Sequence, residues 1–89
     1  LSSVSGQVQI VGHTDNRPIN SLRFPSNWHL SQERANSVKQ LLIKMNAPAH
    51  RLTAVGHADT EPVSTNTTSE GRARNRRVEI ILIAAHENN

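Results

Sequence analysis

The 89-residue sequence contains no cysteine, so disulfide bonds cannot stabilise it and redox chemistry gives no indication of its compartment. No apolar run approaches the roughly 20 residues that a membrane-spanning helix needs, and no signal-peptide pattern is visible. The only aromatic residues are Phe24 and Trp28, so a core in a domain of this size must be mostly aliphatic. Because the sequence begins with Leu1 rather than Met, we expect it to be part of a longer chain.

The formal net charge is +3, and four arginines gather near the C-terminus: Arg72, Arg74, Arg76 and Arg77. A basic cluster can bind nucleic acid, but this one lacks interleaved aromatic residues and is flanked by Glu70 and Glu79. We therefore expect no nucleic-acid partner. A solvated structural cluster remains an alternative, and so does contact with an anionic cell wall polymer.

Hydrophobic patterning predicts strands at residues 8–11, 52–56 and 77–83. A long helix is expected to begin at residue 27 or 30 and end at 45, and a short helix to occupy residues 70–75. The strand–helix–strand order indicates a parallel crossover, and apolar residues on both faces of the last strand indicate that it is largely covered. We expect one α+β domain over residues 1–89, with a core at 7–84, flexible ends at 1–6 and 85–89, and helices on one face of a mixed sheet.

The long helix carries an arginine on its apolar side. Residues at helical spacing share one face, and Arg34 falls among them; the set is Leu30, Arg34, Val38, Leu41 and Met45. Neighbouring apolar residues complete the expected buried face: Ala35, Val38, Leu41, Leu42 and Met45. A guanidinium there needs a carboxylate partner from the protein or from a ligand, and Asp15 is the obvious protein candidate. We expect Phe24 and Trp28 to form an apolar cap over the helix start.

Two stretches repeat one pattern 44 residues apart: VGHTDNRPI at residues 11–19 and VGHADTEPV at residues 55–63. Each is a strand end followed by Gly-His-x-Asp and a proline, so both turns should flank one edge of the sheet, where ligands often bind. Two similar local turns are the alternative for the second copy. A zinc site would have His13, Asp15, His57 and Asp59 as ligands. Against such a site, a His-x-Asp sequence in an extended turn points its two side chains apart, and no glutamate is obviously placed as a general base. We therefore expect no enzyme, no cofactor and no metal.

Three blocks, GHTD, NWHLSQERA and NRRVEI, occur in an order that resembles the OmpA-like peptidoglycan-binding domain. The resemblance runs from about Val8 to Ile83. It implies an OmpA-like β-α-β-(α)-β fold from which an initial strand and helix are missing, so the domain looks N-terminally truncated. The segments GHADTEP and RARNRRVEI are most similar to anchors of the TssL/TagL type in type VI secretion, and the MotB-type flagellar stator is the second branch.

The resemblance also implies a ligand-binding site. It carries the family's ligand-binding aspartate onto Asp15 and its ligand-binding arginine onto Arg34. Other residues implied to border the ligand are Thr14, Asn16, Asn27, Leu30 and Arg76, while Arg77 is expected to support the strand. Diaminopimelate in peptidoglycan offers an ammonium and a carboxylate on one carbon, which suit an aspartate acceptor and a planar arginine donor. An internal Asp15–Arg34 salt bridge without ligand is the alternative.

The function implied is noncovalent anchoring of a type VI secretion machine to diaminopimelate-type peptidoglycan by the periplasmic domain of an inner-membrane protein. Alternatives are a MotB-type stator anchor and a protein–protein interaction module of a cell-envelope complex. Implied partners are peptidoglycan and other subunits of the complex, with a homodimer also considered. Membrane attachment would come only from an upstream anchor.

Overall fold

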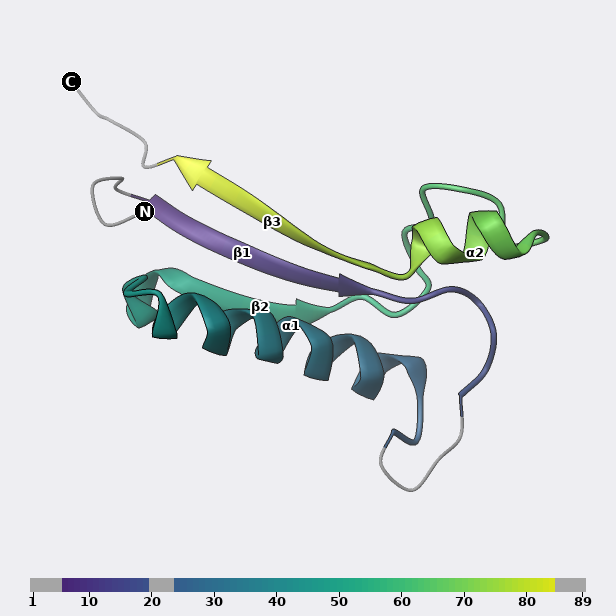
Figure 1. The fold of residues 1–89 in the computed structure, drawn as a ribbon, viewed down its shortest axis with the longest axis horizontal. Helices are drawn as coiled ribbons and strands as arrows, with labels where there is room; N and C mark the ends of the chain where they lie inside the picture. The colour runs from purple at the N-terminus through teal and green to yellow at the C-terminus, as the bar shows by residue number, and fades with distance from the viewer. Residues whose placement is uncertain (1–5, 20–23, 85–89) are drawn as a thin grey trace.

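Strands and helices alternate along the part of the chain that the structure, a computed structural model, describes, which is residues 6–19 and 24–84. The elements in order are β1 (Gly6–His13), α1 (Asn27–Lys44), the 3-10 turn η1 (Ala49–Arg51), β2 (Leu52–Gly56), α2 (Ser69–Asn75) and β3 (Arg77–Ala84). Helix α1 packs against the sheet beside β1 and β2, and α2 lies near the start of β3 (Figure 1). The predicted α+β fold, with its mixed sheet, is therefore confirmed.

The three strands are ordered β2-β1-β3, with β1 parallel to β2 and antiparallel to β3. This confirms the expected parallel pairing of the strands on either side of α1. In the parallel pair, Val11 lies opposite Val55 and Gly12 opposite Gly56. The register thus equals the 44-residue offset of the sequence repeat, so equivalent residues of the two copies are neighbours in space.

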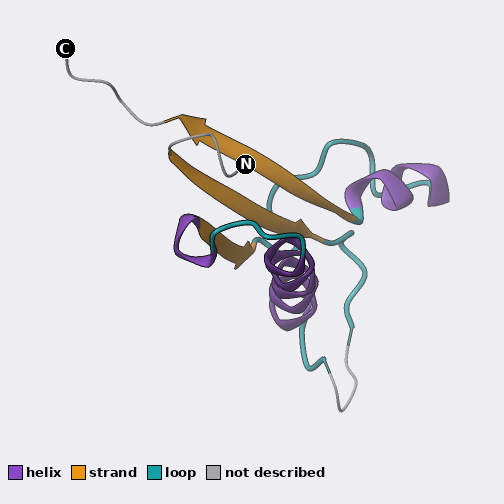
Figure 2. Cartoon of the chain, turned by 60° about the vertical axis from the view of Figure 1, so that its left-hand side comes forward, coloured by secondary structure: helices purple, strands orange, loops and turns teal. Residues whose placement is uncertain are grey.

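Helix α1 begins where Ser26, in extended conformation, accepts a hydrogen bond at its side chain from the backbone amide of His29. The face turned to the sheet follows Ser31, Ala35, Val38 and Leu42. The view in Figure 2, nearly down the axis of α1, shows the helix lying against one side of the sheet. The buried cluster contains Val8, Ile10, Ala35, Ala47 and Leu52.

The predicted buried face of α1 is wrong at two positions, because Leu41 is 55% exposed and Met45 is 68% exposed. The face of α1 that packs on the sheet runs through Ser31 rather than Leu30. It is therefore displaced by one residue from the apolar pattern of the sequence. Ser31 can replace a larger residue there because Gly12 of β1 and Gly56 of β2 lie beneath it. An ideal Cβ on Gly12 would collide with the Ser31 carbonyl, and one on Gly56 would collide with the Gln32 amide.

Two further expectations about burial are wrong. Trp28 is 54% exposed, so it does not form a buried cap over the helix start. Strand β3 is not covered: its four central apolar residues are 40–55% exposed, and they are Ile80, Ile81, Leu82 and Ile83. The reason is that β3 is an edge strand, whereas α1 packs mainly on β1 and β2. Among the apolar residues of β3, Val78 does pack against the core.

The expected flexible start at residues 1–6 needs one correction, since Gly6 already belongs to β1 and pairs with Ala84. The remaining positions of that prediction, 1–5 and 85–89, lie outside the described residues. The short helix α2 begins one residue earlier than expected, after the Thr68 side chain accepts a hydrogen bond from Gly71. Strand β2 has its predicted bounds.

Candidate functional site

A pocket of about 270 Å³ lies where the chain leaves the carboxyl end of β1. Its lining comes from the loop after β1, the first turns of α1 and the residue before β3. The lining residues are Thr14, Asp15, Arg17, Pro18, Ile19, Asn27, Leu30, Arg34 and Arg76. The volume falls just below the range of about 300–1,000 Å³ typical of small-molecule sites, so it suits one amino-acid-sized group.

Asp15 is the central acid of the pocket, and its side chain is 11% exposed. One carboxylate oxygen accepts a 2.8 Å hydrogen bond from Arg76 Nη1, which is also an ion pair. The other oxygen accepts a 3.0 Å hydrogen bond from the backbone amide of Arg17. Each oxygen has capacity for a further donor, so the carboxylate is held in place without being saturated.

These contacts set the ionisation of Asp15. Burial by itself would raise the pKa of this carboxyl group, because it disfavours the charged form. The hydrogen bonds from Arg76 and from the Arg17 amide, together with the positive charges of both arginines, more than offset the burial and leave the pKa of Asp15 below its ordinary value. The site therefore presents a carboxylate anion at neutral pH.

Arg34 lines the same pocket from helix α1, one turn after Ser31, the residue that lies against Gly12 and Gly56. The structure brings Arg34 and Asp15 to one cavity, as expected, but the protein partner of Asp15 is Arg76 rather than Arg34. Within residues 6–19 and 24–84, Arg34 forms no ion pair. The reason for the difference is that Arg76, at the entry to β3, is close enough to donate directly to Asp15, which leaves the Arg34 guanidinium available.

Asn27 and Thr14 hold the pocket loop in shape. Asn27, the first residue of α1, donates from Nδ2 to the carbonyls of Arg17 at 2.9 Å and Asp15 at 3.4 Å. Thr14 Oγ1 donates to the Asp15 carbonyl at 2.8 Å. Of the residues predicted for the site, all lie in the pocket lining except Asn16, whose side chain is exposed and is not part of the lining.

Arg76 and its neighbour Arg77 point to different partners. Arg77 donates from Nε to Glu79 at 2.7 Å and from Nη2 to the backbone carbonyl of Glu61 at 3.0 Å. It therefore fastens the start of β3 to the loop after β2. The structure thus places Arg76 at the pocket and Arg77 along the strand, which is the division of roles that the sequence indicated.

The residue before this pair, Asn75, is fully buried and was not recognised as important. Its Oδ1 accepts hydrogen bonds from the amides of Val63 and Ser64, and its Nδ2 donates to the Ser64 carbonyl and to Asn66 Oδ1. This side chain pins the 63–66 loop to the end of α2, directly beside Arg76. Nothing in the local sequence pattern indicates so many partners.

Sequence reasoning also missed Arg17, Pro18 and Ile19 in the lining. A signal was available, because an aspartate often caps the amide two residues later, and here that amide belongs to Arg17. With these residues included, three arginines and one aspartate surround the cavity. The resulting excess of positive charge favours a ligand that carries carboxylate groups as well as an ammonium.

The four-residue zinc set considered from the sequence is not brought together. Among the described residues, the one group of at least three potential metal ligands is His13, His57 and Glu61. Asp15 is engaged with Arg76 instead, and Asp59 is exposed and is not a member of the group. Glu61 occupies the repeat position equivalent to Arg17, so the two strand exits differ at that position.

Comparison with known proteins gives consistent matches. The model of the OmpA family matches residues 2–76. A solved cell wall anchor of the T6SS from Pseudomonas aeruginosa is 59% identical, has a TM-score of 0.85, and is matched over 96% of this chain and 59% of that chain. The periplasmic domain of Helicobacter pylori MotB is 30% identical with a TM-score of 0.82, over 90% of this chain and 51% of that chain.

Among curated proteins, Motility protein B of Bacillus subtilis is 47% identical over 75 residues, which are 83% of this chain and 29% of that protein. The chain therefore spans only about a third of the length of the curated relatives it matches. In the part of the chain that the structure describes, no helix combines the length and the apolar character needed to cross a membrane.

Proposed function

Because the chain belongs to the OmpA family, we propose that it binds diaminopimelate-type peptidoglycan noncovalently in the periplasm and anchors a membrane-embedded machine to the cell wall. The observation that carries this proposal is the pocket in which an ionised Asp15 lines one cavity with Arg34, which forms no ion pair among the described residues. Asp15 would accept the ammonium of the diaminopimelate side chain, and Arg34 would donate to its carboxylate through two parallel hydrogen bonds.

The remaining lining residues have supporting parts in this proposal. Arg76 keeps Asp15 ionised and oriented, and Asn27 fixes the backbone carbonyls of Asp15 and Arg17. Leu30 supplies an apolar wall for the methylene groups of the ligand. Binding of this kind breaks no covalent bond, so the proposed role is non-catalytic.

The machine that we favour is a type VI secretion system, because the solved T6SS anchor is 59% identical to this chain. The chain would then be the wall-binding domain of an inner-membrane protein that works with other envelope subunits. A flagellar stator is the second candidate, supported by the MotB structures and by the Bacillus subtilis motility protein. The proposed pocket chemistry is the same for either candidate.

The test is binding to purified sacculi and to soluble stem peptides of the diaminopimelate and lysine types, measured by pull-down and calorimetry. A lysine-type peptide lacks the side-chain carboxylate and leaves Arg34 without its ligand partner. An unmet charged hydrogen bond costs on the order of 2–4 kcal/mol, which is roughly 30- to 1,000-fold in affinity. We expect the lysine-type peptide to bind more weakly by that factor.

Variants separate the two charges of the pocket. Arg34→Ala and Arg34→Lys should both lose binding, because an ammonium cannot reproduce the planar guanidinium fork. Asp15→Asn keeps the shape of the side chain but removes its charge, so it should lose binding too.

Arg74→Ala is the matched control, because Arg74 is exposed on α2 and does not line the pocket. Equal affinity for the two peptide types, or full binding by a folded Arg34→Ala variant, would refute the assignment.

A further inference from the structure

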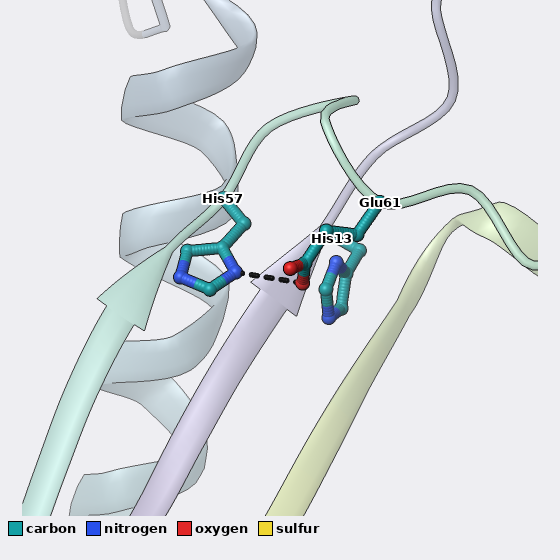
Figure 3. A group of neighbouring side chains, drawn as sticks. All are labelled: His13, His57 and Glu61. Carbon is teal, nitrogen blue, oxygen red and sulfur yellow. Dashed lines mark hydrogen bonds and ion pairs between the residues drawn. The ribbon is translucent and has the colours of Figure 1, made fainter.

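His13, His57 and Glu61 form a cluster next to the pocket but on the other side of the sheet. In β1, residues 8, 10 and 12 face α1, since Val8 and Ile10 belong to the core and Gly12 lies beneath Ser31. His13 is therefore on the opposite face. Figure 3 shows its side chain, together with those of His57 and Glu61, in front of the sheet with the helix behind.

The parallel register explains why the two histidines meet. Gly12 lies opposite Gly56, and the pairing continues because the His57 amide donates to the Gly12 carbonyl at 2.9 Å. His13 and His57 thus leave neighbouring strands at the same level. Their ring centroids are 5.7 Å apart and the rings are nearly perpendicular, at 82°.

Glu61 closes the cluster from the loop that follows β2. Its Oε1 lies 3.0 Å from His57 Nδ1, and one ligand atom from each of the three residues lies within 4.8 Å of the others. Tetrahedral zinc with bonds of about 2.0–2.1 Å places its ligand atoms roughly 3.3 Å apart. The atoms of the cluster therefore need to close by only about 1.5 Å at most, which side-chain rotation of the accessible His57 and Glu61 can supply.

A second observation concerns His13, which is 1% exposed but leaves its ring nitrogens without a well-aligned hydrogen bond. Nε2 lies 3.3 Å from Glu79 Oε1, on the β3 side, so Nδ1 is the nitrogen left without any partner in the part of the chain that the structure describes. Buried polar atoms are rarely left unpaired, and one that is unpaired beside a histidine and a carboxylate needs an explanation. A metal ion bound at Nδ1 would satisfy it.

The surroundings of His13 also suit a metal ligand. A metal-bound histidine commonly directs its other ring nitrogen toward a carboxylate, and Glu79 is in that place.

From this geometry we propose that His13, His57 and Glu61 bind a divalent transition metal, with Zn²⁺ as the best fit. Two imidazoles and one carboxylate are a donor set that zinc favours, whereas Mg²⁺ and Ca²⁺ prefer oxygen ligands alone. His57 and Glu61 are partly exposed, so a fourth position opens to solvent. The bound ion would connect the end of β1 to the loop after β2, two residues from Asp15.

The test is calorimetry of the chelator-treated 89-residue chain with zinc chloride at pH 7.5 in a non-coordinating buffer. We expect one saturable site, no binding of Mg²⁺, and a melting temperature that rises with zinc. His57→Ala and Glu61→Gln should each weaken zinc binding at least tenfold. His50→Ala is the matched control, because His50 is an exposed histidine in η1, outside the cluster.

His13→Ala is not used, because removing a buried side chain can unfold the domain. Both chosen variants change partly exposed side chains, and the Glu61 backbone carbonyl that accepts from Arg77 is retained. Zinc binding unchanged in both variants, an equal loss in His50→Ala, or no saturable site in the wild type would overturn the proposal. Sacculus binding in the presence of chelator should be unchanged in both variants, which separates this site from the peptidoglycan pocket.

Discussion

The carboxylate of Asp15 connects segments that are far apart in sequence. Arg76 lies 61 residues away and donates to one oxygen, while the amide of Arg17 donates to the other. The charged form of Asp15 is therefore favoured in the folded chain but has no such partners in the unfolded chain. This difference ties the stability of the fold to pH.

Folding should depend on the protonation of Asp15 in a defined direction. Since its pKa is lowered by folding, the carboxylate stabilises the protein above about pH 4, the ordinary aspartate pKa, and this stabilisation is lost as pH falls through the lowered folded value. We expect the difference in unfolding free energy between wild type and Asp15→Asn to be constant near neutrality and to shrink below about pH 4. This difference in unfolding free energy is measured by urea denaturation from neutral to strongly acidic pH, with chelator present.

The control for this experiment is Glu33→Gln, because Glu33 is an exposed carboxylate of α1 that forms no ion pair within the described residues. The difference in unfolding free energy between wild type and Glu33→Gln should not change comparably as the pH falls. A difference between wild type and Asp15→Asn that stays constant over the whole pH range would contradict a folded-state role for the charge.

At the residue scale, the motifs predicted which residues gather at the pocket but not how they pair. Asp15, Asn27 and Arg34 were placed correctly because they lie in short blocks with a recognisable order. The Asp15–Arg76 pair and the hydrogen bonds of Asn75 depend on how the ends of α2 and β3 pack. Such contacts are set by tertiary structure, so no local spacing indicates them.

At the scale of elements, the position of α1 depends on two glycines in adjacent strands. Gly12 and Gly56 have no side chain, so the backbone of α1 at Ser31 and Gln32 can approach the sheet closely. Ser31 Oγ also accepts a hydrogen bond from the amide of Ala58, whose positive φ of 53° marks the turn after β2. The helix is thus fixed against the carboxyl ends of both β1 and β2.

Gly12→Ala should therefore be strongly destabilising for its size. The new methyl group would meet the Ser31 carbonyl, a backbone atom that cannot rotate away, so we expect a loss of about 1–3 kcal/mol in unfolding free energy. The matched control is Thr53→Ala, an equally small change at an exposed position of β2. Urea denaturation measures both, and an unchanged midpoint for Gly12→Ala would contradict the close approach.

Most element boundaries could be predicted, because caps and strand patterns are local features. Burial was harder. The buried face of α1 was predicted wrongly because two glycines of the sheet allow Ser31, instead of an apolar residue, to pack against it. The coverage of β3 was misjudged because an apolar pattern reports what could be buried, whereas the strand order places β3 at an edge.

At the scale of the whole molecule, β3 presents apolar side chains on both faces. Ile80 and Leu82 share the face of the core residues Val8 and Ile10, and Ile81 lies on the opposite face. An exposed edge strand of this composition favours association between chains.

We expect the isolated 89-residue chain to self-associate as its concentration rises, and Ile81→Lys and Leu82→Lys to suppress that association. Lysine on an edge strand opposes pairing by charge and by solvation. Val63→Lys is the matched control, because Val63 is 59% exposed but lies in a loop. Sedimentation velocity measures the effect. A wild type that stays monomeric at every concentration, or association that persists in both β3 variants, would contradict this role of β3.

The register of the sheet has a mechanical consequence. Gly6 and Ala84 are paired at one end of the sheet, while His13 and Arg77 are paired at the other, where Asp15 follows. A pull that enters at Gly6 and is resisted by a ligand at Asp15 therefore runs along the covalent backbone of β1. The hydrogen bonds to β2 and β3 stand across that direction, so a pull along β1 does not open them one at a time. Under the proposed function, tension between machine and wall would be carried by one central strand braced on both sides.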